Sequence, residues 1–144
     1  MFETLISKLQ DDKYLTLETT PQHEPSMHNI VEKIKKFKIN SKVDGFTCTD
    51  NPLAKLKYNS LFAALKLQQE FKKPVIATMT MRDRNKIALQ SDLLGANDFD
   101  IRAILALTGD PANMSDQPNS KGVFEANSLM LLKMIKSFNY GMDF

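Results

Sequence analysis

Polar and charged side chains cluster at four places along the chain, each directly after a short apolar run. The clusters are 18–20, 49–51, 80–84 and 108–110. Carboxylates can act as general acids or bases, and hydroxyls and guanidinium groups can bind and orient a ligand. If the four clusters meet at one edge of the fold, the concentration of carboxylates and guanidinium groups favours a ligand-binding or catalytic site over ordinary packing.

Glu18 is the member of these clusters that packing explains least well. It lies in LTLETTPQ, residues 15–22, where an apolar segment ends just before Pro21 and no helix begins. Placing a carboxyl group at the end of a buried strand costs desolvation free energy. Such a costly placement is typical of a functional residue. Glu18 is therefore the leading candidate for a catalytic carboxyl group.

The other strand-end acids have simpler interpretations. Asp50 and Asp83 each directly precede a helix or a turn, and we interpret both as capping residues. In the sequence TGD, Gly109 would let the backbone approach a flat ligand closely, and Asp110 could hydrogen-bond to that ligand. A simple turn explains the same two residues equally well.

Several familiar site patterns do not occur in the sequence. Neither GxxxxGK[ST] nor GxGxxG is found, so no P-loop or Rossmann dinucleotide site is predicted. His23 and His28 have no third ligand near them in the sequence, and no metal site is expected. Cys48 is the single cysteine, which excludes an internal disulfide, and we interpret it as a small buried residue.

Four strands, each followed by a helix, must position the polar clusters. The expected strands are 15–20, 43–50, 74–81 and 103–110, and the expected helices are 3–9, 27–37, 59–71, 84–99 and 127–138, the last two capped by Asn85 or Asp83 and by Asn127 or Ser128. The strands recur about every 30 residues, which is the length of a βαβ unit and requires parallel pairing. Their nearly continuous apolar character is typical of a parallel sheet covered on both faces. The spacing leaves open whether the sheet is doubly wound or part of a (β/α)8 barrel.

Composition limits the class of protein. The chain has 144 residues, about one ordinary domain, with 42% hydrophobic residues, 25% charged residues and a formal net charge of +2. These values are typical of a soluble globular protein and give no indication of nucleic-acid binding. Since no signal-peptide pattern and no membrane-spanning apolar run occurs, a cytoplasmic location without membrane contact is expected.

Five blocks of sequence carry a family resemblance. They are LETTP, TCTDNP, MTMRDRNKIALQSDLLGA, ILALTGDPA and GVFEANSLMLLKMI. In this order and spacing, the chain resembles the methylenetetrahydrofolate reductase family, in particular its branch in anaerobic one-carbon metabolism. The third block and LTGD are long and specific, and the likeness extends from Leu15 to the end of the sequence.

This resemblance implies a fold, a cofactor and a reaction. The family folds as a (β/α)8 barrel that holds FAD at the carboxyl ends of the strands, and we expect FAD in preference to FMN. The flavin takes hydride from NADH or NADPH, or electrons from another donor, and passes them to 5,10-methylenetetrahydrofolate to give 5-methyltetrahydrofolate. The protein would supply orientation and electrostatics while the flavin performs the redox chemistry.

By motif position, the resemblance also implies roles for individual residues. Glu18 matches the family's strand-one glutamate, the proposed general acid that assists opening of the substrate's methylene bridge to an iminium. A partly desolvated carboxyl group can keep the proton that this role requires. Asp110 matches the LTGD aspartate, a catalytic residue near flavin and pterin. The positions that would contact the cofactor are Thr49, Thr80, Thr108, Gly109 and Asp110.

The chain departs from the family pattern in two respects. Thr78 and Met81 stand where some relatives carry a histidine and a cysteine. The sequence also ends after four β/α units. We therefore expect residues 1–14 to form a lead-in helix, and residues 15–144 to form the parallel (β/α)4 portion of a TIM (β/α)8 barrel without its C-terminal half.

A half barrel would leave its first and last strands as edges and expose the apolar barrel interior. We expect the chain to associate with itself or with a second polypeptide, and to act on a folate substrate as an incomplete or split reductase. One alternative is a non-catalytic flavin- or folate-binding or subunit-docking module derived from such a reductase. Another is a flavodoxin-like domain, which is disfavoured because TPQHEPS, after the first strand, lacks a phosphate-cradling composition.

Overall fold

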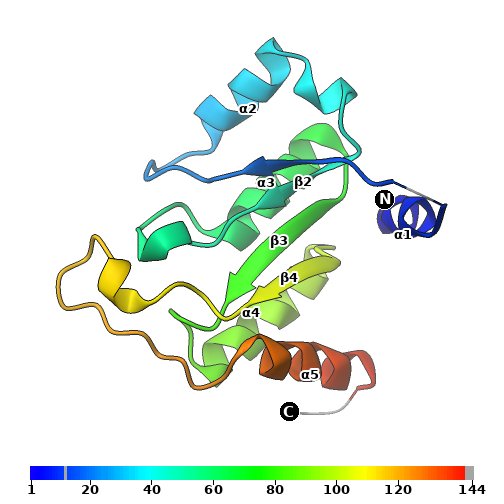
Figure 1. The fold of residues 1–144 in the computed structure, drawn as a ribbon. Helices are drawn as coiled ribbons and strands as arrows, with labels where there is room; N and C mark the ends of the chain where they lie inside the picture. Colours follow the sequence, from blue (N-terminus) through cyan, green and yellow to red (C-terminus); the bar gives the residue numbers. More distant parts are fainter. Residues whose placement is uncertain (12, 142–144) are drawn as a thin grey trace.

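The computed structural model describes residues 1–11 and 13–141 and contains each strand and helix expected from the sequence (Figure 1). The helices are α1 (Phe2–Asp11), α2 (His28–Lys36), α3 (Ser60–Phe71), α4 (Lys86–Asp98) and α5 (Ser128–Asn139); the strands are β1 (Thr16–Thr19), β2 (Gly45–Cys48), β3 (Val75–Thr80) and β4 (Ala103–Leu107); and the short 3-10 turns are η1 (Ile39–Ser41), η2 (Pro52–Ala54) and η3 (Ala112–Met114). None of the described helices is long and apolar enough to cross a membrane.

The four strands form one parallel sheet in the order β1-β2-β3-β4. In the paired register, Thr16 lies beside Gly45 and Phe46 lies beside Val75. A flavodoxin-like layout would place the first strand inside the sheet, between the second and third, so that alternative is wrong. Sequential strand order with a helix after each strand is the arrangement of a partial TIM barrel.

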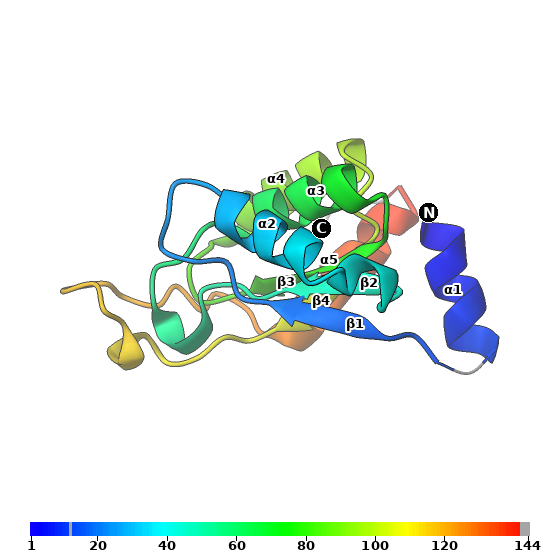
Figure 2. The same cartoon turned by 90° about the horizontal axis from the view of Figure 1, so that it is seen from above.

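Helices α2 to α5 all pack on the same face of the sheet. Figure 2 shows α2, α3 and α4 side by side over that face. Alternate strand residues, including Phe46, Cys48 and Met79, point into one buried cluster with the apolar stripes of the helices. The helix residues of that cluster include Val31 and Ile34 of α2, Leu67 of α3, Leu89 of α4, and Leu131 and Met134 of α5.

The opposite face of the sheet is left open by these helices. Strand alternation turns Glu18, Leu105 and Leu107 to this face, and all three are exposed, the two leucines by 45% and 42%. The open face agrees with the exposed barrel interior expected of a half barrel, and it differs from the two covered faces that are typical of a complete parallel sheet. The open face corresponds to the interior of a closed barrel, and β1 and β4 are the two edges of the sheet.

Three helices begin at an asparagine whose side chain caps the first turn. The Oδ1 atoms of Asn59, Asn85 and Asn127 each accept hydrogen bonds from backbone N–H groups two or three residues further on. Of the alternatives left by the sequence, Asn85 caps α4 in place of Asp83, and Asn127 caps α5 in place of Ser128. Because these caps fix where each helix starts, they also fix the loops that carry the polar clusters.

Cys48 lies in β2 on the covered face and is 0% exposed. Burial raises the pKa of its thiol to about 11, against a smaller opposing effect of its hydrogen bond with Thr19. The thiolate is the nucleophilic form of cysteine, so this thiol is unreactive near neutral pH. The interpretation of Cys48 as a small buried residue is confirmed.

Replacement of Leu131 by alanine tests the helix-covered core. Leu131 is 0% exposed, so Leu131→Ala leaves a cavity and should lower the free energy of unfolding by about 2–5 kcal/mol. Its neighbour Leu132 is 52% exposed, and Leu132→Ala should change that free energy by less than about 0.5 kcal/mol. Urea denaturation followed by circular dichroism measures both. Equal losses would contradict the observed packing of α5 on the sheet.

Candidate active site

The carboxyl ends of the four strands lie at one edge of the sheet, as parallel pairing requires (Figure 1). The loops that follow β2 and β4 meet at this edge, where η2 contacts η3. The four polar clusters predicted from the sequence follow these strand ends. The fold therefore gathers them at one edge, where ligands bind in parallel α/β proteins.

Glu18 lies in β1 beside Thr47 of β2. The side chain of Glu18 is exposed on the open face, whereas the hydroxyl of Thr19 points to the covered face and lies 3.4 Å from the sulfur of Cys48. The expectation of a partly desolvated Glu18 is wrong for the described residues, because they leave the open face uncovered. In this environment the carboxyl group can contact a ligand directly.

Asp50 is the centre of a buried charge network. Its side chain is 1% exposed, and its Oδ2 accepts hydrogen bonds from the backbone N–H of Thr80 at 2.9 Å and from the Thr80 hydroxyl at 3.1 Å. Arg84 Nη1 donates to the same oxygen at 2.6 Å, and Arg84 Nε donates to Asp92 at 2.8 Å. Burial acts to lower the pKa of Arg84, but the two carboxylates outweigh burial and raise it. Asp50 thus fastens the end of β2 to the end of β3.

Arg82 has a side chain that is only 2% exposed, and it pairs with the adjacent Asp83. Its Nε and Nη2 donate to the two carboxylate oxygens of Asp83 at 2.8 and 2.7 Å, and Nη2 also donates to the backbone carbonyl of Asn51 at 3.0 Å. Hydrogen bonding from Arg82 holds the pKa of Asp83 below its ordinary value. The interpretation of Asp50 and Asp83 as capping residues is therefore wrong, because two buried guanidinium groups require their carboxylates.

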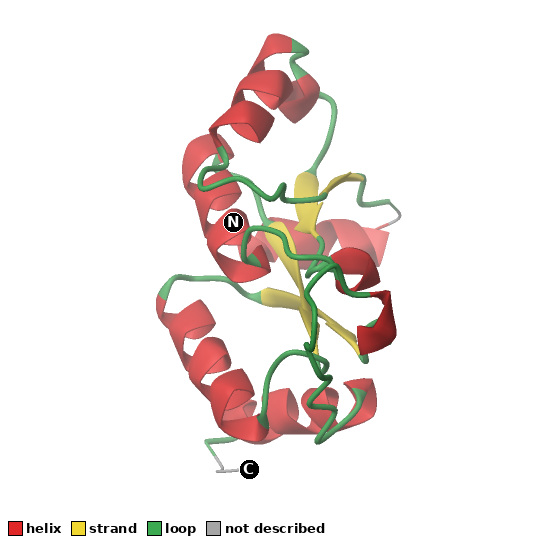
Figure 3. Ribbon diagram, turned by 90° about the vertical axis from the view of Figure 1, so that its left-hand side faces the viewer, coloured by secondary structure: helices red, strands yellow, loops and turns green. Residues whose placement is uncertain are grey.

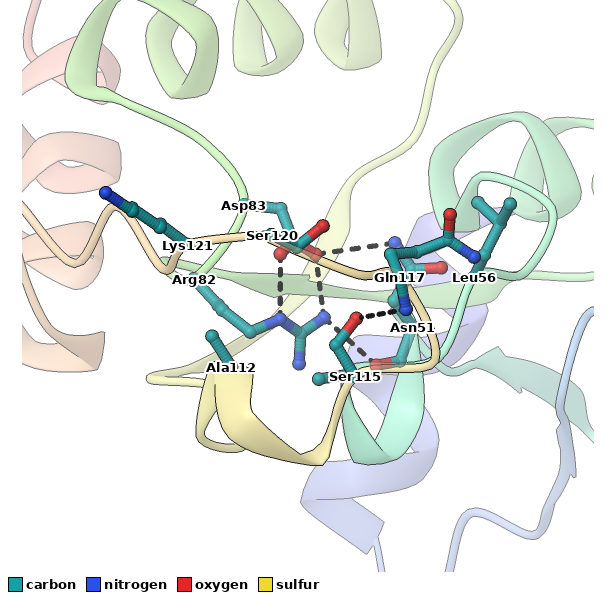
Figure 4. Close-up of a pocket in the computed structure, with 10 residues that line it drawn as sticks. Asn51, Leu56, Arg82, Asp83, Ala112, Ser115, Gln117, Ser120 and Lys121 are labelled. Carbon is teal, nitrogen blue, oxygen red and sulfur yellow. Dashed lines mark hydrogen bonds and ion pairs between the residues drawn. The ribbon is translucent and has the colours of Figure 1, made fainter.

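A cavity of about 180 Å³ lies beside Arg82, and Asn51, Asp83, Ser115 and Lys121 are among its lining residues (Figure 4). Within the described part of the chain, the Nη1 atom of Arg82 is buried and has no hydrogen-bond partner. Figure 4 shows this nitrogen on the side of the guanidinium group that faces away from Asp83. A residue that lines the cavity therefore carries a buried donor without an acceptor among the described residues.

Asp110, which follows β4, holds the loop after β2. Its Oδ2 accepts a hydrogen bond from the backbone N–H of Leu53 at 2.6 Å. Leu53 and Ala54 both have a φ of 56°, in the left-handed region that is costly for residues other than glycine and asparagine, and Asn51 has a φ of 42° in the same region. Such strain persists where the surrounding structure enforces it, frequently at functional sites. The contact with Leu53 is one such constraint, so Asp110 and the strained loop position each other.

Gly109 occupies a place that only glycine can fill without distortion. Its φ is +103°, and an added Cβ would lie 3.0 Å from the Cβ of Arg82 and 3.2 Å from the Cβ of Thr80. Close packing of the end of β4 against the end of β3 is therefore sufficient to explain this glycine. The neighbouring Thr108 is engaged by α5, since its hydroxyl accepts a hydrogen bond from the backbone N–H of Ser128 at 3.3 Å.

Thr49 differs from the other two threonines predicted to contact a cofactor. The hydroxyls of Thr80 and Thr108 are bonded to Asp50 and to Ser128, whereas the Oγ1 of Thr49 is buried without a partner among the described residues. A buried hydroxyl without a partner costs free energy that a polar ligand atom would recover. Of the three threonines, Thr49 therefore has the geometry best suited to a ligand contact.

The contacts join most, but not all, of the predicted site residues. Gly109 packs on Thr80, and Asp110 holds the loop that begins after Thr49, while Glu18 stands apart on β1, two strands from Thr80. Sequence reasoning gave no separate role to Arg82, although the alternating charges of RDRN were the available signal. No group of three or more histidine, cysteine, aspartate or glutamate side chains suited to a metal ion occurs among the described residues.

The fold is that of a partial β/α barrel, with polar side chains gathered at the carboxyl ends of its strands. The model of the family described as methylenetetrahydrofolate reductase matches residues 3–144. The chain therefore belongs to the methylenetetrahydrofolate reductase family, a family of oxidoreductases. A search of curated proteins found no match to the sequence.

Alanine at Gly109 tests the close approach of β4 to β3. Gly109→Ala places a Cβ against Arg82 and Thr80 at a left-handed φ and should lower the free energy of unfolding by more than about 1 kcal/mol. Gly95 is the matched control, because it lies in α4 with nothing within 4 Å of an added Cβ, and Gly95→Ala should stabilise by about 0.5–1 kcal/mol. Chemical denaturation measures both, and a neutral Gly109→Ala would refute the packing argument.

Proposed function

We propose that this chain contributes to the flavin-dependent reduction of 5,10-methylenetetrahydrofolate to 5-methyltetrahydrofolate. The observation that carries the proposal is the family match over residues 3–144, which includes the strand-end motifs around Glu18 and Asp110. The gathering of those motifs at the ligand edge of a parallel sheet supports it. Glu18 and Asp110 are the proposed catalytic residues.

The proposed cofactor is FAD, with FMN as the second choice and NADH or NADPH as the electron donor. Among the described residues, the buried hydroxyl of Thr49 fits such a group because it lacks a partner. Thr49 would hold a polar atom of the flavin, and Thr80, Thr108, Gly109 and Asp110 would shape the edge beside it. The flavin, when bound, supplies the hydride chemistry.

Glu18 is proposed to donate a proton to the folate substrate. It is exposed on the open face, so a substrate lying there can reach its carboxyl group. Asp110 is proposed to lie near the flavin and the pterin and to tune both, while its carboxylate also holds the strained backbone at Leu53. Both roles use groups at the strand ends and need no metal ion.

We further propose that other β/α units complete the barrel over the open face. The exposed leucines Leu105 and Leu107 lie on that face, and the parallel edges β1 and β4 can pair with additional strands. Another polypeptide or a second copy of this chain is proposed as a source of such units. The alternative is that the chain is a non-catalytic flavin- or folate-binding or subunit-docking module derived from such a reductase.

The substitution Glu18→Gln tests the proton-donor role in whichever assembly is active. It removes the proton with little change of shape, so reduction of the flavin by its donor should stay within about twofold while the folate half-reaction slows by about 10²–10⁴-fold. Stopped-flow absorbance of the flavin separates the two half-reactions. Glu24→Gln, at an exposed acid in the loop after β1, is the control. Equal loss in both half-reactions would contradict the role of Glu18.

The completion of the barrel is tested by the behaviour of the purified chain in solution. Exposed apolar surface on the open face should produce self-association in sedimentation velocity, or binding of a hydrophobic fluorescent dye that is lost on addition of a completing partner. Leu105→Lys with Leu107→Lys should reduce both signals, because charge on the open face opposes association. A monodisperse monomer that binds no dye would contradict completion by further units.

A further inference from the structure

The proposed reductase chemistry gives no role to the guanidinium group of Arg82, which lines the cavity described above. The guanidinium group of Arg82 is almost fully buried. Its Nη1 and Nη2 atoms carry two N–H bonds each, so these two atoms together need four hydrogen-bond acceptors. Nη2 is occupied by Asp83 and by the carbonyl of Asn51, whereas Nη1 has no acceptor in the described part of the chain. From this geometry we propose that the cavity is a binding site for a carboxylate group.

The hydrogen-bonding groups around the cavity call for an acceptor. Both N–H bonds of the buried Arg82 Nη1 lack an acceptor among the described residues. The Oγ of Ser115 accepts a hydrogen bond from the backbone N–H of Gln117 at 3.0 Å, which leaves the hydroxyl proton of Ser115 to donate elsewhere. A carboxylate accepts such bonds at each oxygen, and bonds between a guanidinium group and a carboxylate are stronger than neutral ones.

The charges around the cavity favour a single negative charge on the ligand. Asp83 already neutralises Arg82 through its Nε and Nη2 edge, and Lys121 adds a second cation to the lining. Asp50 and Asp110 lie close enough to add to the raised pKa of Arg82, after the larger effect of its hydrogen bond with Asp83. A dianionic phosphate would meet these carboxylates at greater cost than a carboxylate would.

The size of the cavity limits what carries the carboxylate. About 180 Å³ admits the acid group and a few attached atoms, not a whole cofactor. Two sources share this chemistry: the glutamyl arm of a folate-type molecule and a free small carboxylic acid. The site is independent of the proposed function, because its geometry would be the same if the chain performed no reduction.

Nuclear magnetic resonance can observe the site in the full chain, in the assembly in which it is isolated. Acetate and acetamide have the same shape and differ in charge, so they are the probes. Acetate should shift the Arg82 Nε–H resonance and the backbone amide resonance of Ser115 saturably, and acetamide should shift them at least about tenfold less effectively. No shift with acetate would mean that Nη1 is satisfied by water alone, and equal shifts would mean a neutral acceptor; either result overturns the proposal.

Two variants localise the site. Lys121→Gln removes an exposed cation from the lining and should weaken acetate binding by about two- to fivefold, whereas Lys133→Gln, at an exposed position on α5, should leave it unchanged. Arg82→Lys should weaken it by about tenfold or more, provided that the circular dichroism spectrum is retained. If Lys121→Gln and Lys133→Gln behave alike while acetate still binds, the carboxylate lies elsewhere and the assignment fails.

The source of the carboxylate is identified with two larger probes. p-Aminobenzoyl-L-glutamate carries the glutamyl arm without a pterin, and succinate represents a free small acid. Whichever displaces acetate at the lower concentration identifies the source, and displacement by neither would overturn the proposal. Because these titrations require neither flavin nor turnover, failure of the reductase assay and failure of this site are distinguishable.

Discussion

A parallel sheet is stable only when its apolar surface is removed from water, and in this chain a single face is covered. Phe46, Cys48 and Met79 point into the layer formed by α2 to α5, so the alternate strand residues must point to the other side. That other side carries Glu18 beside Thr47 at one edge and Leu105 and Leu107 at the opposite edge. The same constraint therefore leaves the carboxyl group of Glu18 accessible and creates an exposed apolar surface at Leu105 and Leu107.

The ligand edge depends on charges that are buried in pairs. Each of Arg82 and Arg84 would be costly to bury alone, and each is matched by a carboxylate within hydrogen-bonding distance. Through Asp50, these pairs hold the ends of β2 and β3 together, and through Gly109 the end of β4 packs against them. Figure 3 shows how the loops at this end cross over the strands. The strand ends are thus a rigid base, and a ligand would contact the few polar atoms, such as the Thr49 hydroxyl, that this base leaves without partners.

Much of the fold was predictable from the sequence, and part of the site was not. The strands and helices follow from apolar periodicity, and Asn85 and Asn127 follow from the preference of asparagine for helix starts. The same local reasoning was wrong for Asp50, because its partner Thr80 lies 30 residues further along the chain. A capping preference depends on adjacent residues. The partners of a buried carboxylate, by contrast, are the hydrogen-bond donors that the fold brings near it, and these can lie far away in the sequence.

The sequence by itself determined the β/α units, their parallel pairing and the family, since these depend on periodicity, spacing and long motifs read along the chain. Only the tertiary structure decided that Asp110 holds the loop at Leu53, that Asp50 pairs with Arg84, and that Nη1 of Arg82 is buried without an acceptor among the described residues. These features arise where segments distant in the sequence meet. The burial and the charge balance of a side chain at such a contact depend on all the helices, strands and loops that pack around it. No single segment of the sequence encodes them.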